Sequence, residues 1–511
     1  MDLKRRRESP SSGFQPTINQ SLPTSVARQL YLSLRDAVAN GQLTDGQRMP
    51  STRLASKEWK LSRGTVSEAY EILVSEGYAV ARHGSGTYIS VGVTREFDAL
   101  EHPKEPVTYS TSRKISSAAA GILKYGSILE PPAAVPFVTG RIAQDARTAS
   151  LLGQIARRHK NYAFEGYGDI QGDADLRTAI ADHLAASRAV RCTPDQLFIT
   201  AGTQQALDLA FRVLSSPGDT AVIEDPCYPP ARQCLALNGL DIIGLPVDAD
   251  GLQIELLKSR SMNAPRLFYI TPSNQYPTGS ILSLSRRMQL LAYVRENGCW
   301  IVEDDYDSEF RYEGHSISSL QGLDRHDRVI YTGTFSKALL PGLRIGYVVV
   351  PPDLISVFRS VRPALDRCPA SLQQRIVADF LLEGHYPGHL RRLREKLRAS
   401  RDLLADYLGR RMREHVEFKV PNQGVNLIVT SIADFNSDME IYREAKSEGV
   451  VVMPFSHMNI NPIKRSSLLL GFSGLSEQET DLGTRLLTRT FERVVKLKSS
   501  PGRMEKAPHR P

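Results

Sequence analysis

From about Ser25 the chain carries apolar side chains at helical spacing. An apolar face begins at Ala27 and recurs every three or four residues to Val38, and Gly41 is a good helix stop. Ser51 can cap a second helix that runs to about Trp59. This spacing predicts two helices packed through their apolar faces.

A third helix and a hairpin are predicted next. After a break at residues 60–64, apolar positions between Val66 and Leu73 repeat at helical spacing. Two short apolar pieces, 78–81 and 87–89, then flank a tip that contains two glycines, a pattern typical of a β-hairpin. Three helices and a hairpin predict an α+β winged helix-turn-helix domain over residues 21–92.

The segments on either side of this domain have little periodicity. Residues 1–20 are rich in Ser, Pro and Arg and poor in apolar side chains, so we expect disorder there. Prolines recur through 93–135, where only a short helix near 118–125 is indicated, so this stretch is predicted to be a linker. The basic tail 496–511 is also expected to be disordered.

Between residues 136 and 495, strand-like and helix-like segments alternate. The strand-like segments are 197–200, 220–223, 266–270, 300–302, 329–331 and 344–350. Helical stretches such as 205–214 and 285–296 lie between them. Continuous apolar strands alternating with helices predict an α/β domain with a mostly parallel sheet covered on both faces. In such sheets, ligands bind beyond the carboxyl ends of the strands.

A lysine follows one of these buried strands. Lys337 lies in the stretch 334–347, which follows the strand-like segment 329–331, and Arg344 lies seven residues further on. A desolvated lysine amine condenses with aldehydes, and an arginine fork binds phosphate. The hydroxyls of Thr334 and Ser336 are of the kind that bind phosphate oxygens. This stretch predicts an aldehyde cofactor that bears a phosphate, namely pyridoxal 5'-phosphate (PLP).

Three other strand ends carry groups that suit such a cofactor. Gly202 and Thr203 open a helix, where backbone N–H groups cradle phosphate. Tyr228 offers a flat ring for stacking after the second strand. Asn274 lies in an amide-rich loop after the third.

The fourth strand end is the acidic run 303–307. Asp304 and Tyr306 share one face of their strand because side chains alternate. A carboxylate opposite a pyridine nitrogen keeps the nitrogen protonated, and a phenol can bond the ring hydroxyl. The same acidic run is also compatible with a metal site or a solvated turn.

Composition narrows the class of protein. No apolar run approaches the roughly 20 residues of a membrane span, and no apolar stretch follows the basic cluster at residues 4–7. The five cysteines form no CxxC pair, which fits a reducing cytoplasm without disulfides or zinc. The net charge of +8 permits an anionic partner.

Three motifs in the N-terminal domain resemble the DNA-binding domain of GntR-type transcription regulators. They are Met49-Pro50-Ser51-Thr52-Arg53, Leu61-Ser62-Arg63-Gly64-Thr65-Val66 and Gly84-Ser85-Gly86-Thr87-Tyr88. The resemblance covers about residues 22–90 and implies contacts with double-stranded DNA. The implied contact residues are Arg53, Ser62, Arg63, Thr65, Ser67, His83 and Gly84.

The order of the strand-end groups resembles fold-type I PLP-dependent aminotransferases, as does Tyr167-Gly168-Asp169-Ile170-Gln171-Gly172. The resemblance implies a Schiff base of PLP on Lys337 and a homodimer in which Tyr167 reaches the neighbouring cofactor phosphate. It also implies these cofactor contacts: Gly202, Thr203, Tyr228, Asn274, Asp304, Tyr306, Thr334 and Arg344.

Some positions depart from the aminotransferase pattern. The asparagine motif is longer than usual, and Asp304 lies two rather than three residues before Tyr306, so Glu303 or Asp305 could face the ring instead. Where many of these enzymes carry an arginine for the substrate α-carboxylate, this chain has Leu469. Arg465 and Arg232 are candidate substitutes without motif support.

The two halves together resemble the MocR subfamily of GntR-type regulators. This implies a cytoplasmic, PLP-dependent transcription regulator that senses PLP or an amine or amino-acid effector. An active aminotransferase whose DNA-binding domain is incidental or autoregulatory is the alternative, and Leu469 argues against it. A third interpretation is a DNA-binding protein whose second domain only dimerises.

Overall fold

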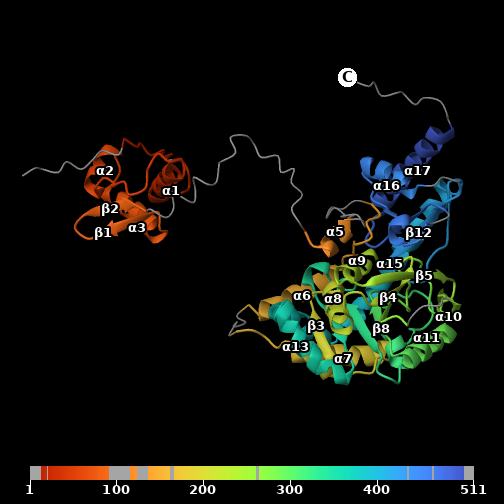
Figure 1. Cartoon of the computed structure of the whole chain (residues 1–511). Helices are drawn as coiled ribbons and strands as arrows, with labels where there is room; N and C mark the ends of the chain where they lie inside the picture. Colours follow the sequence, from red (N-terminus) through yellow and green to blue (C-terminus); the bar gives the residue numbers. More distant parts are fainter. Residues whose placement is uncertain are drawn as a thin grey trace, which may run out of the picture. The chain divides into compact units, whose positions relative to one another are not determined.

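The computed structural model describes residues 13–19, 21–90, 115–123, 136–160, 166–259, 264–433, 437–462 and 465–499. The chain divides into two compact units, Met1–Lys114 and Ile115–Pro511, which are considered separately (Figure 1). The predicted disorder of residues 1–12, the predicted linker at 93–114 and 124–135, and the predicted tail at 500–511 fall outside the described residues, as do residues 91–92 at the end of the predicted DNA-binding domain.

The N-terminal unit is a three-helix winged helix-turn-helix. Its elements are α1 (Val26–Ala39), α2 (Thr52–Glu58), α3 (Arg63–Ser75), β1 (Ala79–Arg82) and β2 (Gly86–Ile89). Ser25, Ser51 and Ser62 cap the three helices, each side chain accepting a hydrogen bond from a backbone N–H in the first turn. The strands pair antiparallel, and the predicted fold is confirmed.

Part of the segment predicted to be disordered has a fixed place on this unit. Trp59 Nε1 donates to the Phe14 carbonyl at 3.0 Å, and the two rings meet edge to face. Phe14 and Ile18 are partly buried against the apolar core of the unit. The prediction of disorder up to residue 20 was therefore too long, because Phe14 covers an aromatic ring that would otherwise face water.

The second unit begins with a helix inside the predicted linker. α5 (Ser117–Leu123) corresponds to the short helix expected near 118–125, and it packs against α9 (Pro229–Leu237).

An eight-stranded sheet forms the centre of this unit, in the order β3-β10-β9-β8-β7-β4-β5-β6 (Figure 1). The strands are β3 (Leu197–Thr200), β4 (Thr220–Asp225), β5 (Asp241–Asp248), β6 (Gly251–Leu252), β7 (Leu267–Ile270), β8 (Trp300–Asp305), β9 (Val329–Thr334) and β10 (Gly346–Val349). β10 runs antiparallel to both neighbours and β6 runs antiparallel to β5, while β5, β4, β7, β8 and β9 are parallel. The predicted mostly parallel sheet is confirmed, but Arg344 lies before β10 rather than within it.

Helices cover both faces of the sheet, because alternate residues of each strand point to opposite sides. Ile301 of β8 joins the apolar cluster on one face and Val302 joins the cluster on the other. The helices packed around the sheet, besides α9, are α6 (Ala146–Arg158), α7 (Ala174–Arg188), α8 (Thr203–Leu214), α10 (Glu255–Ser259), α11 (Leu284–Asn297), α12 (Leu320–Leu323), α13 (Ile355–Leu365), α14 (Ser371–Leu382) and α15 (His385–Arg411). Short 3-10 turns occur at Pro194–Gln196, Pro341–Leu343, Pro352–Leu354 and Phe455–Met458.

A four-stranded antiparallel sheet lies in the C-terminal part, in the order β11-β12-β14-β13. Its elements are β11 (Val416–Phe418), β12 (Asn426–Ser431), β13 (Met453–Pro454) and β14 (Ser467–Gly471), with α16 (Asp438–Ser447) and α17 (Glu477–Ser499) packed beside them. α17 extends past residue 495, where the domain was predicted to end. Among the described residues, no helix combines the length and apolarity that crossing a membrane requires.

Candidate functional site

The residues predicted to meet DNA lie on the surface of the N-terminal unit. Ser62 Oγ accepts from the Thr65 backbone N–H at 3.1 Å, so the cap organises the first turn of α3. Arg63 is exposed at that turn, and its Nε donates to Thr52 Oγ1 at 3.3 Å, which links α3 to α2. Arg53 on α2 is exposed as well, and Ser67 is half-buried one turn further along α3.

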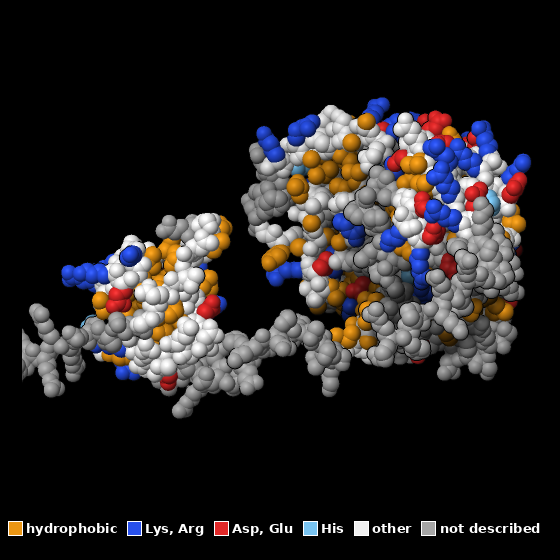
Figure 2. Space-filling model, turned by 90° about the horizontal axis from the view of Figure 1, so that it is seen from above, with side chains coloured by type: hydrophobic (Ala, Val, Ile, Leu, Met, Phe, Trp, Pro, Cys, Tyr) orange, Lys and Arg blue, Asp and Glu red, His pale blue; other side chains and the backbone are white. Residues whose placement is uncertain are grey.

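The wing tip is also accessible. His83 and Gly84 are exposed between β1 and β2, and Gly84 has a φ of +69°, a conformation that favours glycine at this turn. Basic side chains project from this unit among acidic ones (Figure 2). Exposed arginines beside a free helix N-terminus are suited to contacting DNA phosphates and base edges.

In the second unit, a cavity of about 510 Å³ lies at the ends of the central strands. We call it the cofactor cavity. Its walls include these predicted residues: Thr203, Tyr228, Asp304, Tyr306, Thr334, Lys337 and Arg344. Gly202 adjoins it through Arg344, and Asn274 contacts Tyr306. Tyr167 is 74% exposed, with the Arg367 guanidinium 3.7 Å from its ring centroid, and it does not line the cavity.

One end of the cofactor cavity is built for an anion. Gly202, at φ +92°, caps α8, and a Cβ there would come within 2.9 Å of Arg344 Nη2. Arg344 itself is left-handed, at φ +50°, and donates to the Ala201 carbonyl at 2.5 Å. The positive φ favours glycine at residue 202, and the absence of a Cβ leaves room for the Arg344 guanidinium beside the helix N-terminus.

Ser336 adds a hydroxyl to this end. Its Oγ is buried and has no hydrogen-bond partner within the described structure, although the residue lines the cavity. A buried hydroxyl without a partner is costly, and a phosphate oxygen would accept its proton. Arg344, the α8 N-terminus and Ser336 together fit a phosphate ester.

Asp304 is the acid that lines the cofactor cavity. It is 3% exposed and accepts from Tyr269 Oη at 2.8 Å and from Thr332 Oγ1 at 3.3 Å. Burial raises the pKa of Asp304 to about 7, although the Tyr269 hydrogen bond lowers it in part. A carboxylate that gains a cationic partner here would remain ionised.

The neighbouring acids are engaged elsewhere. Glu303 accepts the backbone N–H groups of Leu320 and Gln321, each at 2.8 Å, and Asp305 forms an ion pair with Arg188 at 2.8 Å. Neither lines the cavity, which favours Asp304 over the two alternatives left open by the sequence. Among the described residues, no three His, Cys, Asp or Glu side chains are grouped as metal ligands.

Asn274 is held in one orientation by two residues that the sequence analysis did not single out. Its Nδ2 donates to both carboxylate oxygens of Asp307, at 2.7 and 2.8 Å, and lies 3.3 Å from Tyr306 Oη. Gln423 Nε2 donates to Asn274 Oδ1 at 3.0 Å. Burial raises the pKa of Asp307 to about 8, while the Asn274 hydrogen bond and the charge of Lys337 lower it in part.

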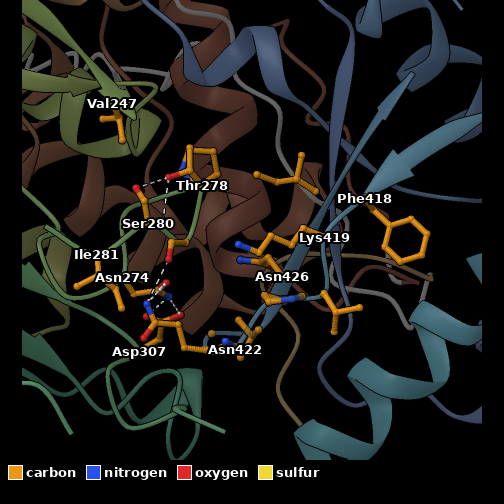
Figure 3. A pocket seen from close by; sticks show the side chains of 18 of the residues that line it. Val247, Asn274, Thr278, Ser280, Ile281, Asp307, Phe418, Lys419, Asn422 and Asn426 are labelled. Atoms are coloured by element: carbon orange, nitrogen blue, oxygen red, sulfur yellow. Dashed lines mark hydrogen bonds between the residues drawn. The ribbon is translucent and has the colours of Figure 1, made fainter. Parts of the chain in front are cut away.

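A second cavity, of about 850 Å³, lies on the other side of Asn274 and Tyr306. We call it the side cavity. Lys419 and Asn426 project into it from one side, and Thr278, Ser280 and Asp307 lie opposite (Figure 3). Asp307 belongs to the acidic run noticed in the sequence, whereas Gln423 and Asn426 carry no motif and come together with the site only in the fold.

The position expected for a carboxylate-binding arginine is occupied by a buried leucine. Leu469 has no exposed surface. Arg465 is half-exposed and pairs with Glu417, and Arg232 donates to the carbonyls of His457 and Asn459 at 2.9 and 2.8 Å. Neither arginine lines the cofactor cavity, so neither takes the place of the missing carboxylate-binding arginine.

Two family models match this chain. Residues 26–89 match the model described as bacterial regulatory proteins, gntR family. Residues 138–483 match the model described as aminotransferase class I and II.

Curated relatives share both parts. The probable rhizopine catabolism regulatory protein MocR of Rhizobium meliloti is 33% identical over 93% of this chain and 95% of its own length. The HTH-type pyridoxine biosynthesis transcriptional regulator PdxR of Corynebacterium glutamicum is 31% identical over 90% of this chain and 94% of its own.

Solved structures resemble the second unit. The α-aminoadipate aminotransferase LysN of Thermus thermophilus, solved with N-(5'-phosphopyridoxyl)-L-leucine, has a TM-score of 0.65 at 27% identity and covers 75% of this chain and 96% of its own. The kynurenine aminotransferase of Pyrococcus horikoshii has the same TM-score at 26% identity and covers 79% and 99%.

Proposed function

This chain belongs to the GntR family of bacterial transcription regulators, in the MocR-type group that joins a helix-turn-helix to an aminotransferase domain, and we propose that it binds PLP at Lys337 and responds to PLP or to an amine or amino-acid effector. One observation carries the proposal. Lys337, Asp304 and Arg344 all line the cofactor cavity, as does Ser336, whose hydroxyl has no hydrogen-bond partner among the described residues.

Bound PLP would supply an aldehyde that condenses reversibly with primary amines. Arg344, Ser336 and the N-terminus of α8 would hold its phosphate, and Tyr228 would lie against the ring. Asp304 would face the ring nitrogen and keep it protonated. Asn274 and Tyr306 would hold the ring oxygen, because Asp307 and Gln423 fix the Asn274 amide.

We further propose that the regulator acts as a homodimer in the cytoplasm. The exposure of Tyr167 outside its own cavity fits a role at the cavity of a second subunit. The two DNA-binding domains of one dimer would bind two half-sites of an operator. An amine that replaces the Lys337 amine on the cofactor would change the charge and packing of the cavity. It would alter DNA binding only if its affinity differs between two arrangements of the dimer that position the DNA-binding domains differently.

An active aminotransferase is the second candidate, since the solved structures similar to the second unit are enzymes. Leu469 disfavours it, because the α-carboxylate of an amino acid would lack its arginine partner.

The test compares purified wild type and Lys337→Ala in the presence of PLP. We expect the visible absorption band of a lysine-bound aldehyde cofactor in wild type and its loss in the variant. Incubation with an amino acid and a keto acid should then give no steady multiple turnovers. A wild type without the band would refute PLP binding at Lys337, and steady turnover would establish the enzyme.

A further inference from the structure

We propose that the effector of the cofactor cavity is a primary amine whose amine-bearing carbon carries no carboxylate. This inference rests on the proposed function, since it concerns the amine that would take the place of Lys337. It goes further by naming the chemical class that the cavity accepts.

The argument starts from the two faces of the C-terminal sheet. Leu468 and Leu470 belong to the apolar core that this sheet shares with α16 and α17, so Leu469 between them points to the other face. Leu469 is directly opposite Ile428 on β12 and Met453 on β13. Because opposed residues share a face, Leu469 lies with two residues that line the cavities.

Among the described strand residues, the cavity-side face of this sheet carries no cation, and the charged side chain on it, Glu417 opposite Thr430, is an acid. Met453 lines the cofactor cavity, Ile428 and Thr430 line the side cavity, and Asn426 lines both. An arginine at residue 469 would stand in the middle of this face. The sheet therefore offers an incoming ligand apolar and amide groups where a cation would be needed for an α-carboxylate.

The charged groups that do line the cofactor cavity are already assigned. Arg344 lies against Gly202 at the phosphate end, and Lys337 is the amine that the effector replaces. Burial lowers the pKa of His457, which favours its neutral form. Among the described residues that line this cavity, no further cation remains to pair with a carboxylate. A charge buried without a partner is strongly unfavourable.

Asn426 indicates what the ligand carries instead. Its Oδ1 is buried and has no hydrogen-bond partner in the described structure. Since Asn426 lines both cavities, a ligand that extends from the cofactor cavity toward the side cavity passes it. Figure 3 shows Asn426 projecting into the side cavity, whose volume of about 850 Å³ suits the remainder of a small molecule. A hydroxyl, amide or second ammonium donor on the ligand would satisfy this oxygen.

The test titrates PLP-loaded full-length protein with matched pairs that differ only in the carboxylate: histamine and histidine, and isoamylamine and leucine. Calorimetry measures affinity, and the visible band reports displacement of Lys337. We expect the amine of at least one pair to bind at least about tenfold more tightly than its amino acid, which is about 1.4 kcal/mol. Equal or tighter binding of the amino acids, or no binding of any amine, overturns this inference. If the visible band of the lysine-bound cofactor is still present in that case, the proposed function stands. A wild type without the band removes both.

A matched substitution tests the residue. Leu469→Arg supplies a guanidinium that can pair with the α-carboxylate, and it should raise the affinity for the amino acids relative to the amines by at least about tenfold. Leu482→Arg, the same change at an exposed site on α17, should leave the preference unaltered. A Leu469→Arg protein that folds, shows the band and keeps the wild-type preference would exclude Leu469 as the determinant. If this variant does not fold, the wild-type pairs still decide the inference.

Discussion

Removal of the Arg188 guanidinium should destabilise the aminotransferase-like unit by about 3–5 kcal/mol. Arg188 Nε lies 2.8 Å from Asp305 Oδ2, and the two side chains are only 5% and 2% exposed. Arg188 Nη2 also donates to Ser273 Oγ at 2.6 Å, so the pair joins α7 to two strand ends beside the site. Burial opposes the charge of Arg188, yet the charge of Asp305 raises the pKa of the guanidinium above its ordinary value.

Arg188→Met keeps most of the aliphatic stem and removes the charge, so among the described side chains Asp305 retains only the Tyr331 hydroxyl, at 2.5 Å. An isolated buried carboxylate is the main source of the predicted loss. In the double variant Arg188→Met/Asp305→Asn this charge is gone, and the total cost should be smaller than the sum of the single costs by more than about 1 kcal/mol.

The assay is urea unfolding followed by tryptophan fluorescence. The chain has two tryptophans, Trp59 in the first unit and Trp300 in the second, so a Trp59→Phe background reports on the second unit alone. Arg212→Met is the control, because Arg212 and Asp208 form a surface pair with side chains 46% and 31% exposed, and it should cost less than about 1 kcal/mol. A cost below about 1 kcal/mol for Arg188→Met, or single costs that simply add, would refute the reasoning.

Three further predictions follow from the two sites. Arg63→Ala should weaken binding to the DNA segment upstream of the protein's own gene at least about tenfold, measured by fluorescence anisotropy, since it removes an exposed cation that can pair with a DNA phosphate. An altered PLP spectrum in the same variant would point to misfolding instead. Asp307→Leu should weaken PLP binding by about tenfold in an absorbance titration, because the Asn274 amide loses its hydrogen-bond acceptor. Asp307→Asn should weaken PLP binding less. Equal losses of affinity in the two variants would show that the size of the side chain, rather than its hydrogen bonding, matters. Without PLP, stability should fall as pH rises from about 4 to 8. Folded Asp304 and Asp307 keep their protons to pKa values of about 7 and 8, while the unfolded chain releases them near 3.8, so the folded state binds more protons throughout this window. A melting temperature of the Asp304→Asn/Asp307→Asn variant that falls with pH as steeply as that of wild type would contradict this assignment.

The sequence was enough to predict the two domains and most of the cofactor cavity. Helical spacing and serine caps identify the DNA-binding domain, since these signals act within a few residues of each other. The strand-end groups converge for a topological reason, because parallel strands bring their carboxyl ends to the same edge of the sheet. Lys337 and Asp304 therefore meet as their order along the chain suggested. Arg344 joins them because it precedes β10, which runs antiparallel to β9 and so begins at the same edge.

What the sequence could not decide depends on contacts between distant segments. The competition among Glu303, Asp304 and Asp305 is resolved by Arg188 and by the backbone N–H groups after Ser319, which engage the two neighbours and leave Asp304 to the cavity. Similarly, Phe14 is ordered because Trp59 receives it.

The C-terminal sheet shows the same division. The sequence by itself determined that residue 469 is a leucine where an arginine is common. Only the tertiary structure decided that its side chain shares a face with Ile428 and Met453. It also decided that Asn426 reaches the site from the second sheet and Gln423 from the connection between β11 and β12. Local patterns specify elements through short-range hydrogen bonding and side-chain periodicity, whereas the chemistry of a cavity depends on which side chains from remote elements share it.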